Sequence, residues 1–204
     1  MDDYKEKDLS GVVYDYGYGL YVNLTNKCPC HCDFCIRDMT DSLGTADSLW
    51  LKEDPSYDDV IEAINLWPLS KYQELVFCGY GEPTERLDLM LDIATYVKKN
   101  TSLLTRVNTN GLSDLINGKF TPPMFEGLVD CVSVSLNQCT AEKYVELCHP
   151  KFGLESFDAI LKFTKDIKEY VPDVRMSIVN VINENDVIKC EQIAESFGIK
   201  LRIR

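Results

Sequence analysis

The chain has 204 residues, 45% of them hydrophobic, and a formal net charge of −12 at pH 7. This length suits one compact domain that buries roughly two-thirds of its unfolded surface. The negative charge argues against nonspecific binding to nucleic acid, which depends on clustered Lys and Arg. The first seven residues lack the apolar stretch of a signal peptide, and no apolar run is long enough to span a bilayer. We therefore expect a cytoplasmic protein whose nine cysteines are reduced thiols.

Short apolar runs alternate with longer amphipathic stretches along the chain, which is typical of repeated strand-helix units and a parallel sheet. We expect strands over residues 18–24, 74–78, 105–109, 130–136, 174–181 and 201–203. Helices are expected over residues 56–66, 87–99, 141–147, 156–170 and 187–197. No linker, repeat or low-complexity segment interrupts this order. The expected organisation is an N-terminal segment, residues 1–17, and a single domain, residues 18–204.

Six strand-helix units are fewer than the eight that a closed barrel requires. With right-handed crossovers they predict a partial (β/α)6 TIM-like barrel of the α/β class, open and with parallel strands. In such folds the functional residues lie at the carboxyl ends of the strands. The motifs described next all follow a predicted strand, so we expect them to form one site.

Three cysteines, Cys28, Cys32 and Cys35, follow the first predicted strand at C-x3-C-x2-C spacing. A [4Fe-4S] cluster normally takes four cysteine ligands. Three ligands would leave one iron with an open coordination position, which favours chemistry over a structural role. The alternative is a structural zinc site that also uses Cys30 and His31, but zinc sites usually pair two cysteine knuckles, and no second knuckle occurs.

These residues carry a family resemblance. The spacing C-x3-C-x-F-C, with Phe34 before the third cysteine, resembles the radical S-adenosylmethionine (radical SAM) superfamily. Gly79-Tyr-Gly-Glu-Pro83 resembles the GGEP segment of that superfamily, with Tyr80 in place of its second glycine. Asn108-Thr-Asn-Gly111 and Ser135-Leu-Asn137 fall where the superfamily contacts its cofactor.

More narrowly, the chain resembles the small radical SAM proteins associated with TatD-type metal-dependent hydrolases. The similarity lies in segments such as Phe77-Cys-Gly-Tyr-Gly-Glu-Pro83 and Val107-Asn-Thr-Asn-Gly-Leu112. That family more often has Arg where His149 stands. The resemblance runs from about residue 18 to residue 204.

The resemblance implies an enzyme that uses a [4Fe-4S] cluster, held by Cys28, Cys32 and Cys35, and S-adenosylmethionine bound to its open iron. Reductive cleavage would give a 5′-deoxyadenosyl radical that abstracts hydrogen from an unidentified substrate, so the cluster and cofactor do the catalysis. The implied cofactor contacts are Phe34, Gly79, Tyr80, Gly81, Glu82, Asn108, Thr109, Ser135 and Asn137. Candidates for contacting the substrate, without a specific pattern, are Arg37, His149, Arg175 and Asn180.

Each cofactor contact also has a structural alternative, because Asn108 and Asn110 can cap a turn and Ser135 can simply be buried in a strand. The alternative function is a non-catalytic iron-sulfur or zinc module that serves a TatD-type hydrolase. The expected partners are an electron donor such as flavodoxin or ferredoxin and a TatD-type hydrolase, with no membrane. A small basic cluster, Lys200, Arg202 and Arg204, is either a solvated strand end or a local basic pocket.

Overall fold

The computed structural model describes residues 8–204, and the first seven residues of the predicted N-terminal segment lie outside the described residues. One seven-stranded sheet has the order β1-β2-β3-β4-β5-β6-β7. Its strands are β1 (Val13–Tyr16), β2 (Gly19–Val22), β3 (Glu74–Phe77), β4 (Leu104–Thr109), β5 (Cys131–Ser135), β6 (Asp173–Ile178) and β7 (Leu201–Ile203). Strands β2 to β7 run parallel, and β7 does not pair back with β1. The predicted open, partial barrel is therefore confirmed.

Six helices connect these strands. They are α1 (Tyr57–Asn65), α2 (Leu87–Asn100), α3 (Ser113–Asn117), α4 (Ala141–Cys148), α5 (Glu155–Ile167) and α6 (Glu184–Ser196). Five of them match expected helices, whereas the short α3 was not expected. Helix α6 begins three residues before the expected position because the side chain of Asn183 accepts a hydrogen bond from the Asp186 amide and caps the helix there.

Strand β1 is the main departure from the sequence prediction. It pairs antiparallel with β2 in a hairpin whose two-residue turn is Gly17-Tyr18. Gly17 has a φ of +66°, which glycine adopts readily. The expected boundary before residue 18 falls inside this turn, so the first strand of the parallel sheet is covered on its outer edge by β1.

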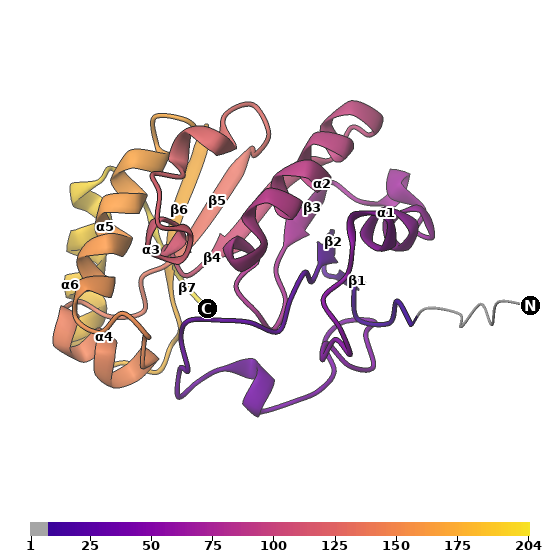
Figure 1. The fold of residues 1–204 in the computed structure, drawn as a ribbon. Helices are drawn as coiled ribbons and strands as arrows, with labels where there is room; N and C mark the ends of the chain where they lie inside the picture. The colour runs from indigo at the N-terminus through magenta and orange to yellow at the C-terminus, as the bar shows by residue number, and fades with distance from the viewer. Residues whose placement is uncertain (1–7) are drawn as a thin grey trace, which may run out of the picture.

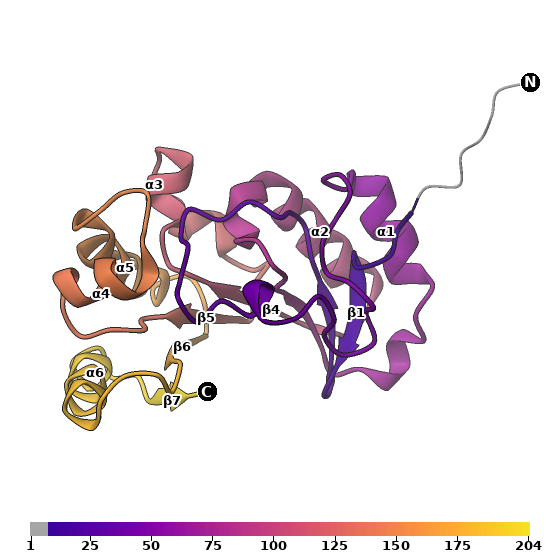
Figure 2. The ribbon, with the colours of Figure 1, turned by 90° about the horizontal axis from the view of Figure 1, so that it is seen from below.

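The core lies between the sheet and the helices. Helices α2 and α5 lie against one face of the sheet (Figures 1 and 2). The strand residues under them are fully buried and apolar: Leu75, Phe77, Val107, Val132, Val134, Met176 and Ile178. Because side chains alternate along a strand, the residues between these point to the opposite, concave face. No helix within residues 8–204 is both long and apolar enough to cross a membrane.

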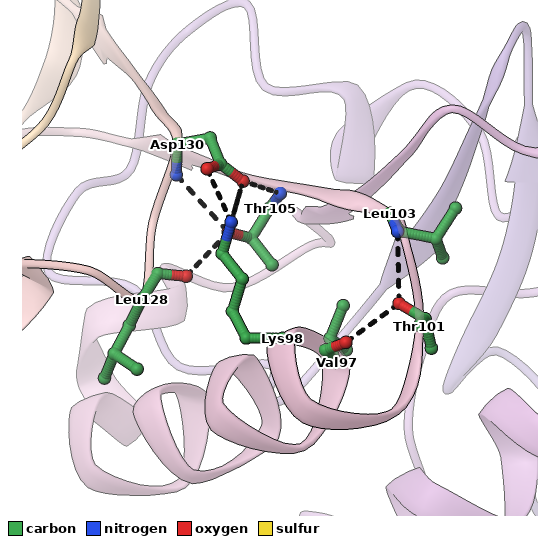
Figure 3. Close-up of polar contacts among 7 residues, drawn as sticks. All are labelled: Val97, Lys98, Thr101, Leu103, Thr105, Leu128 and Asp130. Atoms are coloured by element: carbon green, nitrogen blue, oxygen red, sulfur yellow. Dashed lines mark hydrogen bonds and ion pairs between the residues drawn. The ribbon is translucent and has the colours of Figure 1, made fainter.

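An ion pair fixes the edge of the sheet at which the strands begin (Figure 3). Lys98, in the last turn of α2, lies 2.5 Å from both carboxylate oxygens of Asp130, just before β5. The Thr105 amide donates to Asp130 Oδ2 at 2.7 Å. Burial alone would raise the pKa of Asp130, but these hydrogen bonds hold it below its ordinary value. This edge is thereby secured independently of the carboxyl edge, where the motifs lie.

Candidate cofactor site

The cysteine loop follows β2 and crosses the carboxyl edge of the sheet. Figure 1 shows it along the lower edge of the sheet, and Figure 2 shows it in front of β4 and β5. The amides of His31 and Asp33 donate to the carbonyls of the last two residues of α4, at 3.0 and 3.1 Å. The Lys151 amide donates to the Pro29 carbonyl at 2.7 Å. Main-chain hydrogen bonds thus hold the loop against the end of α4.

Cys28, Cys32 and Cys35 are all partly exposed on this loop, whereas Cys30 is buried. The sulfur of Cys30 lies 3.7 Å from the Tyr144 hydroxyl. Within residues 8–204, no three Cys, His, Asp or Glu side chains already form a group that could hold a metal ion. The donor set nevertheless fits an iron-sulfur cluster, because three accessible thiols share one short loop and metal ligands commonly become ordered only when the metal binds.

Burial raises the pKa of the Cys35 thiol above its ordinary value. A thiol must lose its proton to ligate a metal. Cluster assembly at this loop therefore releases protons and is favoured by rising pH.

The glycines of the Gly79-Tyr-Gly-Glu-Pro83 turn let this turn approach the segment after β2 closely. A Cβ on Gly79 would lie 2.0 Å from Asn23 Oδ1, and a Cβ on Gly81 would lie 2.2 Å from the Thr25 carbonyl oxygen. Tyr80, which replaces a glycine of the superfamily motif, points away from these contacts. Its ring lies 5.1 Å from that of Trp50, in a second small core. Only the backbone of Tyr80 is therefore left to face a cofactor.

Glu82 is buried and ties the end of β3 to the end of β4. Its Oε1 accepts hydrogen bonds from the Thr84 amide and hydroxyl and from the Thr109 hydroxyl, and its Oε2 accepts from the Asn110 amide. Burial raises the pKa of Glu82, while these donors act in the opposite direction. The side chains of Glu82 and Thr109 are thus hydrogen-bonded to each other, and they lie at the border of the site.

Three amide side chains at the carboxyl edge carry oxygens that find no partner in the described part of the chain: Asn23 Oδ1, which follows β2 against Gly79, and two oxygens on neighbouring strand ends. Asn108 Oδ1, on β4, and Asn137 Oδ1, just after β5, are both buried without a hydrogen bond in the described part of the chain. Asn137 also has a φ of +58°, a left-handed conformation that costs a non-glycine residue about 1–2 kcal/mol. Buried acceptors left unpaired are expensive. The hydroxyl groups of a bound ribose are donors of the kind that would satisfy them.

The other predicted site residues have more varied surroundings. Phe34 is partly buried and packs against the main core. The hydroxyl of Ser135 accepts a hydrogen bond from Arg204 Nη2 at 3.1 Å. Both residues lie at the carboxyl edge with the cysteine loop.

The four candidate substrate residues do not share one location. Arg37 folds back onto the cysteine loop, where its Nη2 lies 2.9 Å from His31 Nδ1. His149 is an exposed residue in the left-handed conformation at the end of α4, and its Nε2 lies 2.8 Å from Asp33 Oδ1. Arg175 lies on the concave face and pairs with Asp173, while Asn180 is exposed beside β7. Arg37 and His149 therefore stabilise the loop.

Sequence reasoning missed two residues that contact the cysteine loop. Asn110 Nδ2 lies 4.0 Å from the sulfur of Cys28 and 3.9 Å from that of Cys30. Asn110-Gly111 predicts a turn, and a turn does form, because Asn110 Oδ1 accepts from the Leu112 amide. That turn directs the amide nitrogen to the cysteines. Tyr144 fits the apolar face of a helix, so no sequence signal separates it from an ordinary core residue.

Comparisons with known proteins agree with this architecture. The family model described as the Radical SAM superfamily matches residues 22–194. A radical SAM methyltransferase from Sphaerobacter thermophilus has a similar structure, with a TM-score of 0.64 and 13% identity over 94% of this chain and 57% of that chain. Methylornithine synthase (PylB) gives 0.60 and 13% over 95% and 54%. The structure of anSMEcpe with bound AdoMet gives 0.58 and 20% over 90% and 50%. No curated protein matches significantly in sequence.

An open parallel barrel with a three-cysteine loop across its carboxyl edge defines the class of enzymes that pair an iron-sulfur cluster with S-adenosylmethionine. The family match covers most of the chain, so the chain belongs to the radical SAM superfamily. The family match confirms, at the level of the superfamily alone, the predicted enzyme class and the predicted cofactors, a [4Fe-4S] cluster and S-adenosylmethionine. The chain spans only about half the length of the solved structures it resembles.

Proposed function

We propose that this chain is a radical SAM enzyme in which Cys28, Cys32 and Cys35 hold the cluster and the strand ends hold S-adenosylmethionine. When bound, these groups supply a radical that removes a hydrogen atom from a substrate. The observation that carries the proposal is the pair of orphaned buried oxygens, Asn108 Oδ1 and Asn137 Oδ1, on the carboxyl edge that the cysteine loop crosses.

The residues of the chain would orient the cofactor and keep water out. Backbone groups of the Gly79–Glu82 turn would receive the ammonium of S-adenosylmethionine, since the Tyr80 side chain packs in the second small core and leaves its backbone to face the cofactor. Asn108 and Asn137 would accept hydrogen bonds from ribose hydroxyls. Glu82 would hold the turn in place through its contacts with Thr109 and the Asn110 amide.

We further propose the narrower assignment to the TatD-associated radical SAM proteins and a cytoplasmic location. Support for the subfamily comes from the amino-acid sequences of the Phe77–Pro83 and Val107–Leu112 segments. A TatD-type hydrolase would then be a partner, and a flavodoxin or ferredoxin would supply the electron. Co-purification of the hydrolase from the source organism, compared with a mock-tagged strain, tests the first partner.

Anaerobic reconstitution with iron and sulfide tests the proposed chemistry. The expected product is a brown protein with [4Fe-4S] absorbance that releases 5′-deoxyadenosine from S-adenosylmethionine when dithionite is added. Cys32→Ala should abolish both the cluster and the release. Cys30→Ala should leave cleavage largely intact, and Cys190→Ala, which removes a buried thiol on α6, is the control for loss of a core cysteine.

The alternative of a metal-binding accessory module predicts a different result. A colourless protein that holds one zinc per chain and releases no 5′-deoxyadenosine would refute the enzyme proposal. Loss of cleavage in Cys30→Ala with cleavage retained in Cys32→Ala would refute the ligand assignment while leaving the enzyme class intact.

A further inference from the structure

The concave face of the sheet carries several charged side chains. They alternate with the core residues of their strands, and three cross-strand pairs, Val76 with Arg106, Ser133 with Arg175, and Ser177 with Arg202, place them on one face. The charged residues of this face are Glu74, Arg106, Asp173, Arg175, Arg202 and Arg204. Four arginines thus accompany two carboxylates, on a chain whose net charge is −12.

Two of these arginines already have an acidic partner. Arg106 Nη2 lies 2.8 Å from Glu74 Oε1 and 3.1 Å from the Tyr21 hydroxyl. Arg175 pairs with Asp173 on its own strand. These pairs leave little positive charge available at the end of the sheet where the strands begin.

Arg202 and Arg204 have no carboxylate partner within residues 8–204. The Arg204 side chain reaches back over the sheet and donates to the Ser135 hydroxyl at 3.1 Å. Arg204 is exposed as a whole residue, and this hydrogen bond holds its guanidinium against the sheet. Burial is the main cause that lowers the pKa of Arg204. The nearby charges of Arg202 and Arg106 act in the same direction, whereas Cys78 acts against it. Positive charge is therefore gathered at the carboxyl end of the concave face, where no carboxylate side chain within residues 8–204 pairs with either arginine.

Ser177 provides a second, independent sign of a missing ligand. Its hydroxyl oxygen is buried and has no hydrogen-bond partner in the described part of the chain. The register places Ser177 between Ser135 of β5 and Arg202 of β7. Two guanidinium groups and one free hydroxyl can all donate, so a ligand that fits here is rich in acceptor oxygens.

We propose that Arg202 and Arg204 bind a carboxylate or phosphate group of an anionic substrate and place that substrate over the concave face. The proposal rests on the proposed function, because it assigns the substrate of the same site. Arginine suits this role, since its planar fork binds carboxylate and phosphate through two parallel hydrogen bonds. The contact with Ser135 places the anion beside the predicted cofactor contacts, as hydrogen transfer between substrate and cofactor requires.

Calorimetric titration of the anaerobically reconstituted protein tests the site with two probes, pyrophosphate for phosphate and succinate for carboxylate. We expect saturable binding of at least one probe, which identifies the anion class. The double variant Arg202→Gln/Arg204→Gln should weaken that binding at least tenfold. Arg204→Lys, which keeps the charge but loses the fork, should bind with intermediate affinity. The matched control is Lys99→Gln/Lys165→Gln, which changes the net charge equally at exposed residues and should bind within twofold of the wild type.

Three results would overturn the proposal. They are the absence of saturable binding to either probe, equal binding by the wild type and the folded double variant, and an equal loss in the lysine control. The carboxylate of S-adenosylmethionine is another anion that the arginines could bind. A competition titration with S-adenosylmethionine therefore distinguishes a substrate site from a cofactor site. Displacement of the probe by S-adenosylmethionine would assign the arginines to the cofactor and also overturn the proposal. A failure to release 5′-deoxyadenosine would count against the proposed function alone, because the direct anion titrations need no S-adenosylmethionine and no turnover.

Discussion

Glu82 should contribute more to the free energy of unfolding than any exposed Asp or Glu of this chain. Its carboxylate accepts four hydrogen bonds in a buried site, three at Oε1 and one at Oε2. Glu82→Gln keeps the shape but replaces one oxygen with an NH2 group, so at least one donor must face another donor. An unsatisfied buried donor costs about 1–3 kcal/mol, and loss of charge assistance adds to this. We expect the free energy of unfolding to fall by about 2–4 kcal/mol.

Thermal and urea unfolding of the cluster-free protein would measure this loss. For a chain of this size about 1 kcal/mol corresponds to a melting shift of roughly 2–4 °C, so the melting temperature should fall by roughly 5–15 °C. Glu85→Gln, which makes the same chemical change three residues away at a partly exposed side chain, should stay within about 0.5 kcal/mol of the wild type. Equal stability of Glu82→Gln and Glu85→Gln would show that the four hydrogen bonds do not hold the carboxylate as described.

Two further changes test other parts of the structure. Asp130→Asn should lower the unfolding free energy by about 1–2 kcal/mol at pH 6. Because the folded-state pKa of Asp130 is lowered, its contribution is full above the unfolded pKa of about 4 and is lost as pH falls through the folded pKa. Urea titrations at several pH values should therefore show the two proteins converging toward pH 2, and a pH-independent gap would contradict this. Gly81→Ala should cost about 2–4 kcal/mol and reduce iron incorporation, since its Cβ would lie 2.2 Å from a backbone oxygen. Gly118→Ala, with a φ of +61° and open space around the Cβ, should cost only about 1 kcal/mol, and an equal loss in both variants would refute the steric argument.

The parallel sheet was predictable because its strands are short apolar runs separated by amphipathic helices. Strand β1 escaped prediction for a physical reason. Val13 and Tyr14 are both buried although they are neighbours, because Val13 packs in the main core and Tyr14 in the second core with Leu49 and Tyr80. A four-residue strand whose first two residues are both buried and apolar has no alternation to detect at that point. Leu49 and Tyr80, the buried partners of Tyr14 in the second core, lie more than thirty positions further along the chain.

The order of the site motifs was predictable, but the partners of their side chains were not. The sequence analysis predicted Glu82 and Thr109 as cofactor contacts. In the structure the Thr109 hydroxyl donates a hydrogen bond to Glu82 Oε1 at 2.7 Å. Ser135 was assigned to the cofactor, and its hydroxyl accepts from Arg204, 69 positions away. Such pairings depend on which strands become neighbours and on the register between them. The spacing of residues within a short motif determines neither of these.

The cysteine loop owes its position mainly to backbone contacts. Three main-chain hydrogen bonds join the loop to the end of α4 and the residues after it, and a fourth joins the Glu82 amide to the Lys27 carbonyl at 2.8 Å. Backbone groups are the same whatever side chain a residue carries, so the frame constrains conformation rather than residue type. His149 illustrates the point, because its left-handed backbone ends α4 and leaves the carbonyls of the last helical turn free to accept from the loop. A different residue in that position keeps this backbone frame if it adopts the same φ and ψ, whereas the contact between His149 Nε2 and Asp33 depends on the side chain.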